Sequence, residues 1–156
     1  MMEIVTFEEI LKRDGVLVYR TRGVSMEPML WQNRDLVVIR VPENRLRPLD
    51  TALYRRGSDY ILHRVIGVAD DHYLIRGDNT YMIERVPADA VIGVLTEFRR
   101  KGKTYSVMDK TYRCYAHFWN SIYSVRAFCW RGRNRAVKTA RRLGVLPLLK
   151  KALRHE

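Results

Sequence analysis

The sequence predicts a mainly β fold, an antiparallel and partly rolled sheet with a short helix before it and a basic helical extension after it. Short runs rich in β-branched and aromatic residues recur between residues 16 and 108, and turn residues bound each run. This spacing favours an antiparallel sheet over a βαβ layout. From Lys110 onward, apolar residues recur instead at the three- and four-residue steps typical of a helix.

The N-terminal helix is expected at residues 7–14. Thr6 and Glu9 form a capping-box pattern, in which the Thr6 side chain accepts from the Glu9 amide and the Glu9 carboxylate reaches back to the Thr6 amide. Gly15 can adopt the left-handed conformation that ends a helix. The helix is therefore short and ends directly before the first strand.

The strands follow, and two of their connections indicate hairpins. Residues 69–71 form one turn, and residues 99–103 form a second turn with a basic tip. The β-rich runs lie at residues 16–20, 36–41, 51–55, 60–68, 72–76, 90–98 and 104–108.

Three helices are expected in the extension. The first begins at Lys110 and carries an aromatic stripe, the second spans residues 134–143 and ends at Gly144, and the third spans residues 148–154. We therefore expect two regions, a domain at residues 1–108 and a basic amphipathic extension at residues 109–156.

The net charge of +12 is unevenly distributed. Residues 1–98 carry 13 basic and 15 acidic side chains, whereas residues 99–156 carry 16 basic side chains and 2 acidic ones. Three interpretations of the basic extension stay open: a solvated face, docking on an anionic membrane surface through residues 110–156, and nucleic-acid binding. Aromatic residues beside the arginines support the interpretation as a membrane-docking segment. The absence of a recognised binding module disfavours nucleic-acid binding.

The sequence also limits the compartment and the cofactors. Two cysteines cannot build a disulfide framework and fit a reducing compartment. No segment has the length of apolar sequence that spans a bilayer, and residues 1–5 lack a secretory signal. We expect a cytoplasmic protein, with a peripheral position on the inner face of the cell membrane as an alternative. The spacing of Cys114, His117 and Cys129 matches no standard zinc site, so neither metal nor cofactor is expected.

A candidate catalytic set comes from three polar residues. Ser25 follows the first strand, in Arg22-Gly23-Val24-Ser25-Met26-Glu27-Pro28-Met29-Leu30. A serine needs a base to become a nucleophile, and His63 is the candidate. Alternation along its strand puts His63 on one face with Ile61 and Val65. Asp78, just after the next strand, is the candidate acid that orients the imidazole.

These segments resemble a known family. Gly23-Val24-Ser25-Met26-Glu27-Pro28-Met29 is similar to the Ser-Met-x-Pro box of type I signal peptidases and LexA-like serine peptidases. His63-Arg64-Val65-Ile66-Gly67 resembles their Lys-Arg-Val-Ile-Gly box, with the histidine of the archaeal, endoplasmic-reticulum and sporulation-type branch. Gly77-Asp78-Asn79 resembles the Lys-Gly-Asp-Asn box of that branch. The resemblance covers about residues 16–98.

The resemblance implies a signal-peptidase-like antiparallel β fold and a serine endopeptidase. Ser25 would be the nucleophile, His63 the base and Asp78 the supporting acid, with the Ser25 amide in the oxyanion hole. The branch often has a second acid six residues after the first. In this sequence that position is Glu84, whose side chain is one methylene longer than an aspartate, and it is a possible supporting acid. Substrate would be a protein or precursor peptide, with Met26, Pro28 and Met29 as candidate substrate-binding residues, although core packing explains the methionines nearly as well.

The chain departs from the family pattern in two respects. Gly23 stands where the family sometimes has a hydroxyl residue, and the residues before Ser25 predict a short polar helix in place of the family's transmembrane helix. Two alternatives to the peptidase stay open. One is a catalytically silent peptide-binding or regulatory module of the same fold, and the other is a basic protein associated with nucleic acid.

Overall fold

The β-strands pair in one antiparallel sheet whose order is β1-β2-β7-β3-β4-β5-β6, with β8 on the free part of β7. The computed structural model describes residues 5–142 and divides into two units, Met1–Asn120 and Ser121–Glu156. The strands span β1 Val16–Arg20, β2 Leu36–Arg40, β3 Thr51–Arg56, β4 Asp59–Val68, β5 His72–Arg76, β6 Glu84–Pro87, β7 Val91–Arg100 and β8 Lys103–Ser106. The helices span α1 Phe7–Asp14, α2 Lys110–Ser121 and α3 Tyr123–Arg142, with a 3₁₀ turn at Ala88–Ala90.

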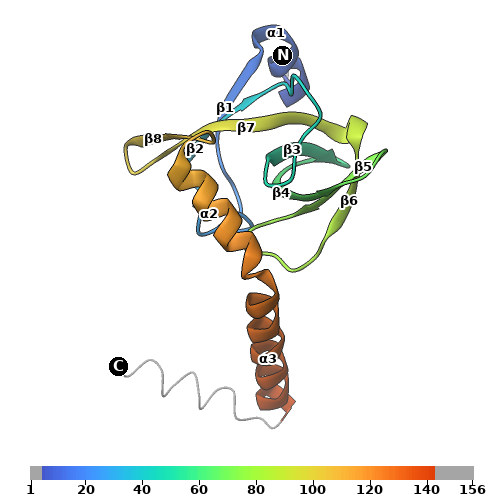
Figure 1. Cartoon of the computed structure of the whole chain (residues 1–156), viewed down its shortest axis with the longest axis vertical. Helices are drawn as coiled ribbons and strands as arrows, with labels where there is room; N and C mark the ends of the chain where they lie inside the picture. The colour runs from blue at the N-terminus through green and yellow to red at the C-terminus, as the bar shows by residue number, and fades with distance from the viewer. Residues whose placement is uncertain (1–4, 143–156) are drawn as a thin grey trace. The chain divides into compact units, whose positions relative to one another are not determined.

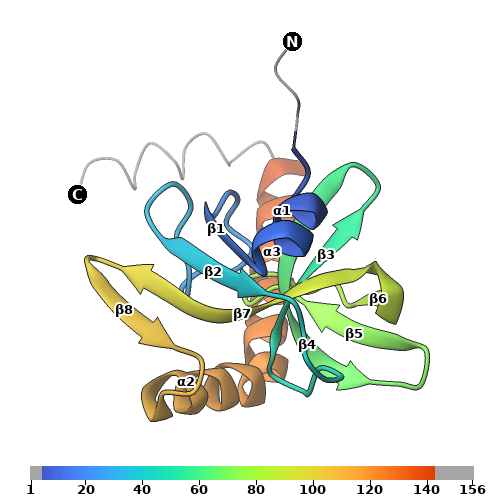
Figure 2. The same ribbon diagram turned by 90° about the horizontal axis from the view of Figure 1, so that it is seen from above.

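The sheet is curled (Figures 1 and 2). Its register shifts three times, between Val38 and Ile39, between Leu53 and Tyr54, and between Val65 and Gly67. Such irregularities bend a strand and increase its twist. β7 runs through the middle of the sheet, where it pairs with β2 and β3 and then, beyond β3, with β8. The mainly β, antiparallel and partly rolled architecture predicted from the strand spacing is confirmed.

Helix α1 begins and ends as its sequence predicts. The Glu9 amide donates to Thr6 Oγ1 at 3.3 Å, and the Glu9 carboxylate accepts from the Thr6 amide at 2.7 Å. Gly15 ends the helix with a φ of 70°. The buried Leu11 side chain joins the core beside β1 and β7.

Two apolar clusters fill the two faces of the sheet. Adjacent residues of β3 separate between them, because Leu53 belongs to the first cluster while Ala52 and Tyr54 belong to the second. The first cluster also includes α1, the 26–30 segment and the α2 side chains Tyr112 and Ala116. Because successive side chains of a strand point to opposite faces, those of β4 alternate between the cluster that includes α2 and the cluster on the other face of the sheet.

The structure differs from the predicted elements at three places. β6 was not predicted, and it is the strand that carries Glu84. All of α2 except Ser121 lies in the unit Met1–Asn120, which groups this helix with the sheet, whereas the sequence placed it in the extension. The expected helix start at residue 134 is absent, because α3 runs unbroken from Tyr123 to Arg142 and the chain interrupts its helix at Ile122 instead. The helix expected at residues 148–154 lies outside the described residues.

Candidate active site

Ser25 lies in a tight segment between β1 and β2. Hydrogen bonds within the segment and from Asn79 fix its backbone. Within the segment, the Glu27 amide donates to Val24 O at 3.2 Å and the Leu30 amide donates to Met26 O at 2.9 Å. From outside, the Asn79 amide donates to Ser25 O at 2.7 Å, and Asn79 Nδ2 donates to Val24 O at 3.2 Å. The turn that follows β5 therefore fixes the backbone of the candidate nucleophile.

Gly77 brings Ser25 and His63 together. A Cβ built on Gly77 would lie 2.7 Å from Ser25 O, 3.0 Å from His63 Nε2 and 3.1 Å from Thr80 Cγ2. The serine backbone and the Nε2 side of the imidazole therefore flank the same glycine, which has no side chain to separate them. Within the described residues Ser25 and His63 are not hydrogen-bonded to each other. In enzymes without substrate, the hydrogen bonds of catalysis are often long and shorten only in the complex.

His63 is buried, with 6% of its surface exposed. Its Nδ1 atom lies 3.3 Å from the Tyr54 hydroxyl and 3.5 Å from Glu84 Oε1. Burial lowers the pKa of His63, Glu84 and Asp78 act to raise it, and Arg56 acts to lower it further, so that the pKa lies below its usual 6.5. The imidazole is therefore neutral at pH 7, the state that a general base requires.

Glu84 reaches His63 because three strands stand in register. Glu84 of β6 lies opposite Ile75 of β5, and Ile75 lies opposite Val65 of β4. His63 is two residues from Val65 and so shares its face. The other carboxylate oxygen of Glu84 pairs with Arg56 Nη1 at 3.0 Å. Glu84 thus contacts the imidazole on the nitrogen opposite to the one near Ser25.

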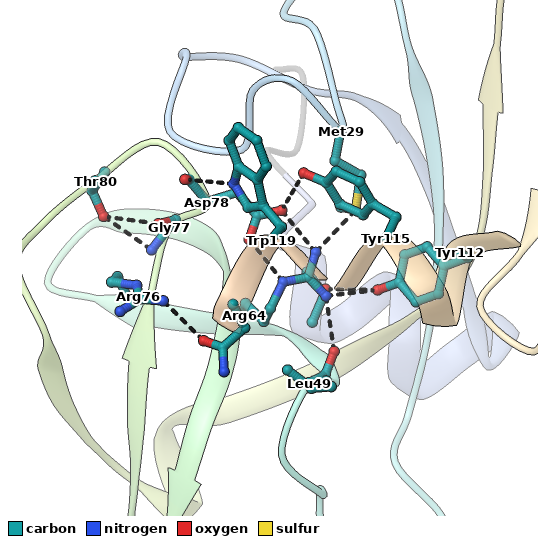
Figure 3. A network of polar contacts seen from close by, with 12 residues as sticks. Met29, Leu49, Arg64, Arg76, Gly77, Asp78, Thr80, Tyr112, Tyr115 and Trp119 are labelled. Atoms are coloured by element: carbon teal, nitrogen blue, oxygen red, sulfur yellow. Dashed lines mark hydrogen bonds and ion pairs between the residues drawn. The ribbon is translucent and has the colours of Figure 1, made fainter. Parts of the chain in front are cut away.

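Asp78 pairs with Arg64 on the other face of the sheet (Figure 3). Arg64 Nε donates to Asp78 Oδ1, and Arg64 Nη2 donates to Asp78 Oδ2, both at 2.7 Å. Only 2% of Arg64 and 4% of Asp78 are exposed. Burial acts to lower the pKa of Arg64, but the Asp78 carboxylate outweighs it and the pKa is raised. The sequence suggested Asp78 as the orienting acid, whereas the structure puts Glu84 against His63 Nδ1, because His63 and Arg64 are neighbours in a strand and face opposite sides.

Helix α2 covers the Arg64–Asp78 pair with aromatic side chains (Figure 3). The Tyr115 hydroxyl donates to Asp78 Oδ2 at 3.0 Å, and Trp119 Nε1 donates to Asp78 O at 2.9 Å. Arg64 Nη1 donates to the Tyr112 hydroxyl at 3.1 Å. The helix that the sequence assigned to the extension therefore holds the turn on which the Ser25 backbone rests.

A cleft of about 740 Å³ opens beside Ser25. One wall is formed by the end of β1 and the residues after it, and the other by the start of β4. The residues that line the cleft are Phe7, Tyr19, Arg20, Thr21, Arg22, Gly23, Ser25, Met26, Leu30, Asn33, Ser58, Asp59, Tyr60, Ile61 and Leu62.

The three candidate substrate-binding residues divide between the cleft and the core. Met26 lines the cleft although it is largely buried. Met29 is also buried, and its sulfur accepts from Arg64 Nη2 at 3.2 Å. Pro28 is half-buried, and its carbonyl accepts from Arg100 at 3.1 Å. Of the three, the structure therefore places only Met26 on the cleft wall.

The site includes residues that the sequence did not indicate. In the sequence, Tyr54, Arg56 and Arg64 have the pattern of ordinary strand residues. The aromatic residues of α2 have the pattern of one face of a helix. Arg64 lies in the His63-Arg64-Val65-Ile66-Gly67 segment, but it was given no role; the signal for one is a charged residue in a strand otherwise rich in apolar residues. Across residues 5–142, no group of three His, Cys, Asp or Glu side chains is placed to hold a metal ion.

Neither a family model nor a curated protein matches this chain. Within the part of the chain that the structure describes, no helix combines the length and the apolar composition needed to cross a bilayer.

Proposed function

We propose that the chain is a serine endopeptidase of the signal-peptidase-like type that cleaves a protein or precursor peptide. The observation that carries the proposal is the convergence at Gly77, where the Ser25 backbone and His63 Nε2 flank a position that only a residue without a side chain can occupy. The curled antiparallel sheet and the resemblance of the three sequence segments support the same family assignment.

In the proposed reaction, Ser25 Oγ attacks the scissile carbonyl carbon while its proton passes to His63 Nε2. A proton on Nδ1, held by Glu84, leaves the Nε2 lone pair available to accept the Ser25 proton. His63 then gives the proton to the departing amine, and a water deprotonated by the same nitrogen hydrolyses the acyl-serine. The Ser25 amide, which donates to no other described residue, is the proposed oxyanion donor. Glu84 therefore takes the role of supporting acid, and Asp78 positions the turn beneath Ser25.

The cleft has Ser25, but not His63, among its lining residues, and it supports an extended peptide as the substrate. β1 pairs only with β2 among the described strands, and the end of β1 lines the cleft. An unpaired strand edge can add a peptide as a further strand through backbone hydrogen bonds. The apolar residues Met26 and Leu62 line opposite walls of the cleft. This geometry favours a peptide substrate over a compact folded one.

We propose a reducing, cytoplasmic compartment for the protein. Cys114 and Cys129 are both exposed and unpaired. Exposed free thiols persist where thiols are kept reduced.

The peptidase proposal is tested by digesting a peptide library with four variants and identifying new termini by mass spectrometry. Ser25→Ala and His63→Ala should abolish cleavage. Ser58→Ala, a second serine of the cleft, and His117→Ala, an exposed histidine, are the matched controls and should cleave like the wild type. Equal cleavage in all variants would overturn the proposal. Binding of library peptides without any cleavage would instead assign the cleft to a silent peptide-binding module.

A further inference from the structure

Helix α3 combines a strong positive charge with exposed apolar side chains. Seven of its 20 residues are Arg or Lys, and none is Asp or Glu. Val125 is 65% exposed and Phe128 is 77% exposed. Exposed large apolar side chains on so charged a helix are unexpected for a purely solvated surface.

One face of α3 carries Val125 and Phe128 and no cation, whereas the exposed Trp130 and Val137 lie on the side that carries arginines. An apolar or small stripe recurs at three- and four-residue steps, so its members share one face, and all of them are exposed. The stripe consists of Val125, Phe128, Cys129, Gly132 and Ala136. A row of cations flanks it on one side at Arg131, Arg135, Lys138 and Arg142, and Arg126 and Arg133 lie on the other side.

We propose that α3 binds an anionic lipid surface, with the helix axis in the plane of the membrane. The stripe around Phe128 would enter the boundary between headgroups and acyl chains, while the flanking cations meet the lipid phosphates. The charge of α3 opposes insertion across the bilayer, since each cation at the membrane centre is costly. The proposal stands on α3 alone and does not depend on the peptidase assignment.

The apolar stripe distinguishes this partner from nucleic acid. A phosphodiester backbone would engage the arginines and leave Val125 and Phe128 without a role, because non-specific binding to nucleic acid rests on charge. A lipid surface engages both sets. Removal of the stripe at constant charge therefore separates the two partners.

The test measures flotation of the full chain with two kinds of vesicle, phosphatidylcholine alone and phosphatidylcholine containing phosphatidylglycerol. The wild type should float only with the anionic vesicles. Val125→Ser with Phe128→Ser should weaken that binding about tenfold, because the two side chains no longer bury apolar surface in the lipid. Val18→Ser with Val41→Ser removes two exposed valines of the other unit as a matched control and should leave binding unchanged.

The electrostatic part is tested by two charge reversals of equal size. Arg131→Glu with Arg135→Glu should abolish flotation, whereas Lys101→Glu with Lys103→Glu, at the exposed tip of the β7–β8 hairpin, should preserve it. Circular dichroism of each variant confirms that its helix content is retained. Equal losses for the two reversals would show attraction by net charge alone and overturn the proposal. Undiminished vesicle binding by the serine variant of α3, with equally tight binding to duplex DNA, would also overturn it and assign the helix to nucleic acid.

Discussion

Glu84 Oε1 lies 3.5 Å from His63 Nδ1, while Nε2 of the same imidazole and Ser25 O both lie within 3.0 Å of a Cβ built on Gly77. The ring therefore has a carboxylate on one nitrogen and the candidate nucleophile on the side of the other. The position of the carboxylate is set by strand pairing, because β6 brings Glu84 to the face of β4 that carries His63.

Replacing the carboxylate at Nδ1 should impair catalysis without unfolding the protein. Glu84→Gln keeps the shape of the side chain but no longer stabilises the imidazolium formed during the reaction. We expect kcat to fall by about 100-fold, within the range of acid–base effects. Arg56→Gln removes the other partner of Glu84 and is the matched control, which should retain most of kcat because the ion pair is exposed. Equal losses of kcat in both variants would speak against an orienting role for Glu84.

The same pair of variants should move the pH profile in opposite directions. Because the pKa of His63 lies below 6.5, kcat/KM should rise with pH through a midpoint below 6.5 and then level off. Glu84 raises the pKa of His63 and Arg56 lowers it. Glu84→Gln should therefore shift the midpoint to lower pH and Arg56→Gln should shift it to higher pH. A wild-type midpoint above 6.5 would be inconsistent with a buried, neutral base.

A side chain at position 77 should separate the catalytic pair. Gly77→Ala puts a Cβ within 2.7 Å of Ser25 O and 3.0 Å of His63 Nε2, so one of them must move. We expect a loss of kcat of about 100-fold, since displacements of about 1 Å are costly in catalysis. Gly132→Ala, where nothing lies within 4 Å of the new Cβ, should leave kcat unchanged. Wild-type kinetics in Gly77→Ala would contradict the close approach at this turn.

Breaking the buried Arg64–Asp78 pair should reduce stability more than breaking an exposed pair. Asp78→Ala leaves the Arg64 guanidinium buried without its carboxylate, which should lower the free energy of unfolding by about 3–5 kcal/mol. Asp14→Ala removes the exposed Arg13–Asp14 pair and should have little effect. Urea denaturation followed by circular dichroism measures both. Similar urea midpoints for Asp78→Ala and the wild type would show that the Arg64–Asp78 pair does not stabilise the fold.

The strands and α1 could be predicted because their signals are local. Alternating β-rich runs gave β1, β2, β3, β4, β5, β7 and β8 within a few residues, and the Thr6–Glu9 capping box together with Gly15 gave both ends of α1. β6 could not be predicted, since Glu84–Pro87 is four residues long and contains two charges and a proline. α3 runs through Gly132 because a single glycine in a helix costs only about 1 kcal/mol.

The acid of the site depends on long-range register, which sequence spacing does not reveal. Asp78 and Glu84 both follow β5, and the sequence alone favours Asp78, which lies in the Gly77-Asp78-Asn79 segment. The pairing of Val65 with Ile75, and of Ile75 with Glu84, decides that Glu84 meets His63. Likewise, nothing local indicates that the Tyr115 and Trp119 side chains close over Asp78, because that contact joins residues about forty positions apart in the chain.

Acid quenching of a cleavage reaction shows whether Ser25 is the nucleophile. Intact-protein and peptide mass spectrometry would locate any acyl group that remains on the enzyme. We expect an acyl adduct on Ser25 that corresponds to the N-terminal product, and neither adduct nor cleavage in Ser25→Ala. Cleavage that continues in Ser25→Ala, or an adduct on another residue, would contradict it.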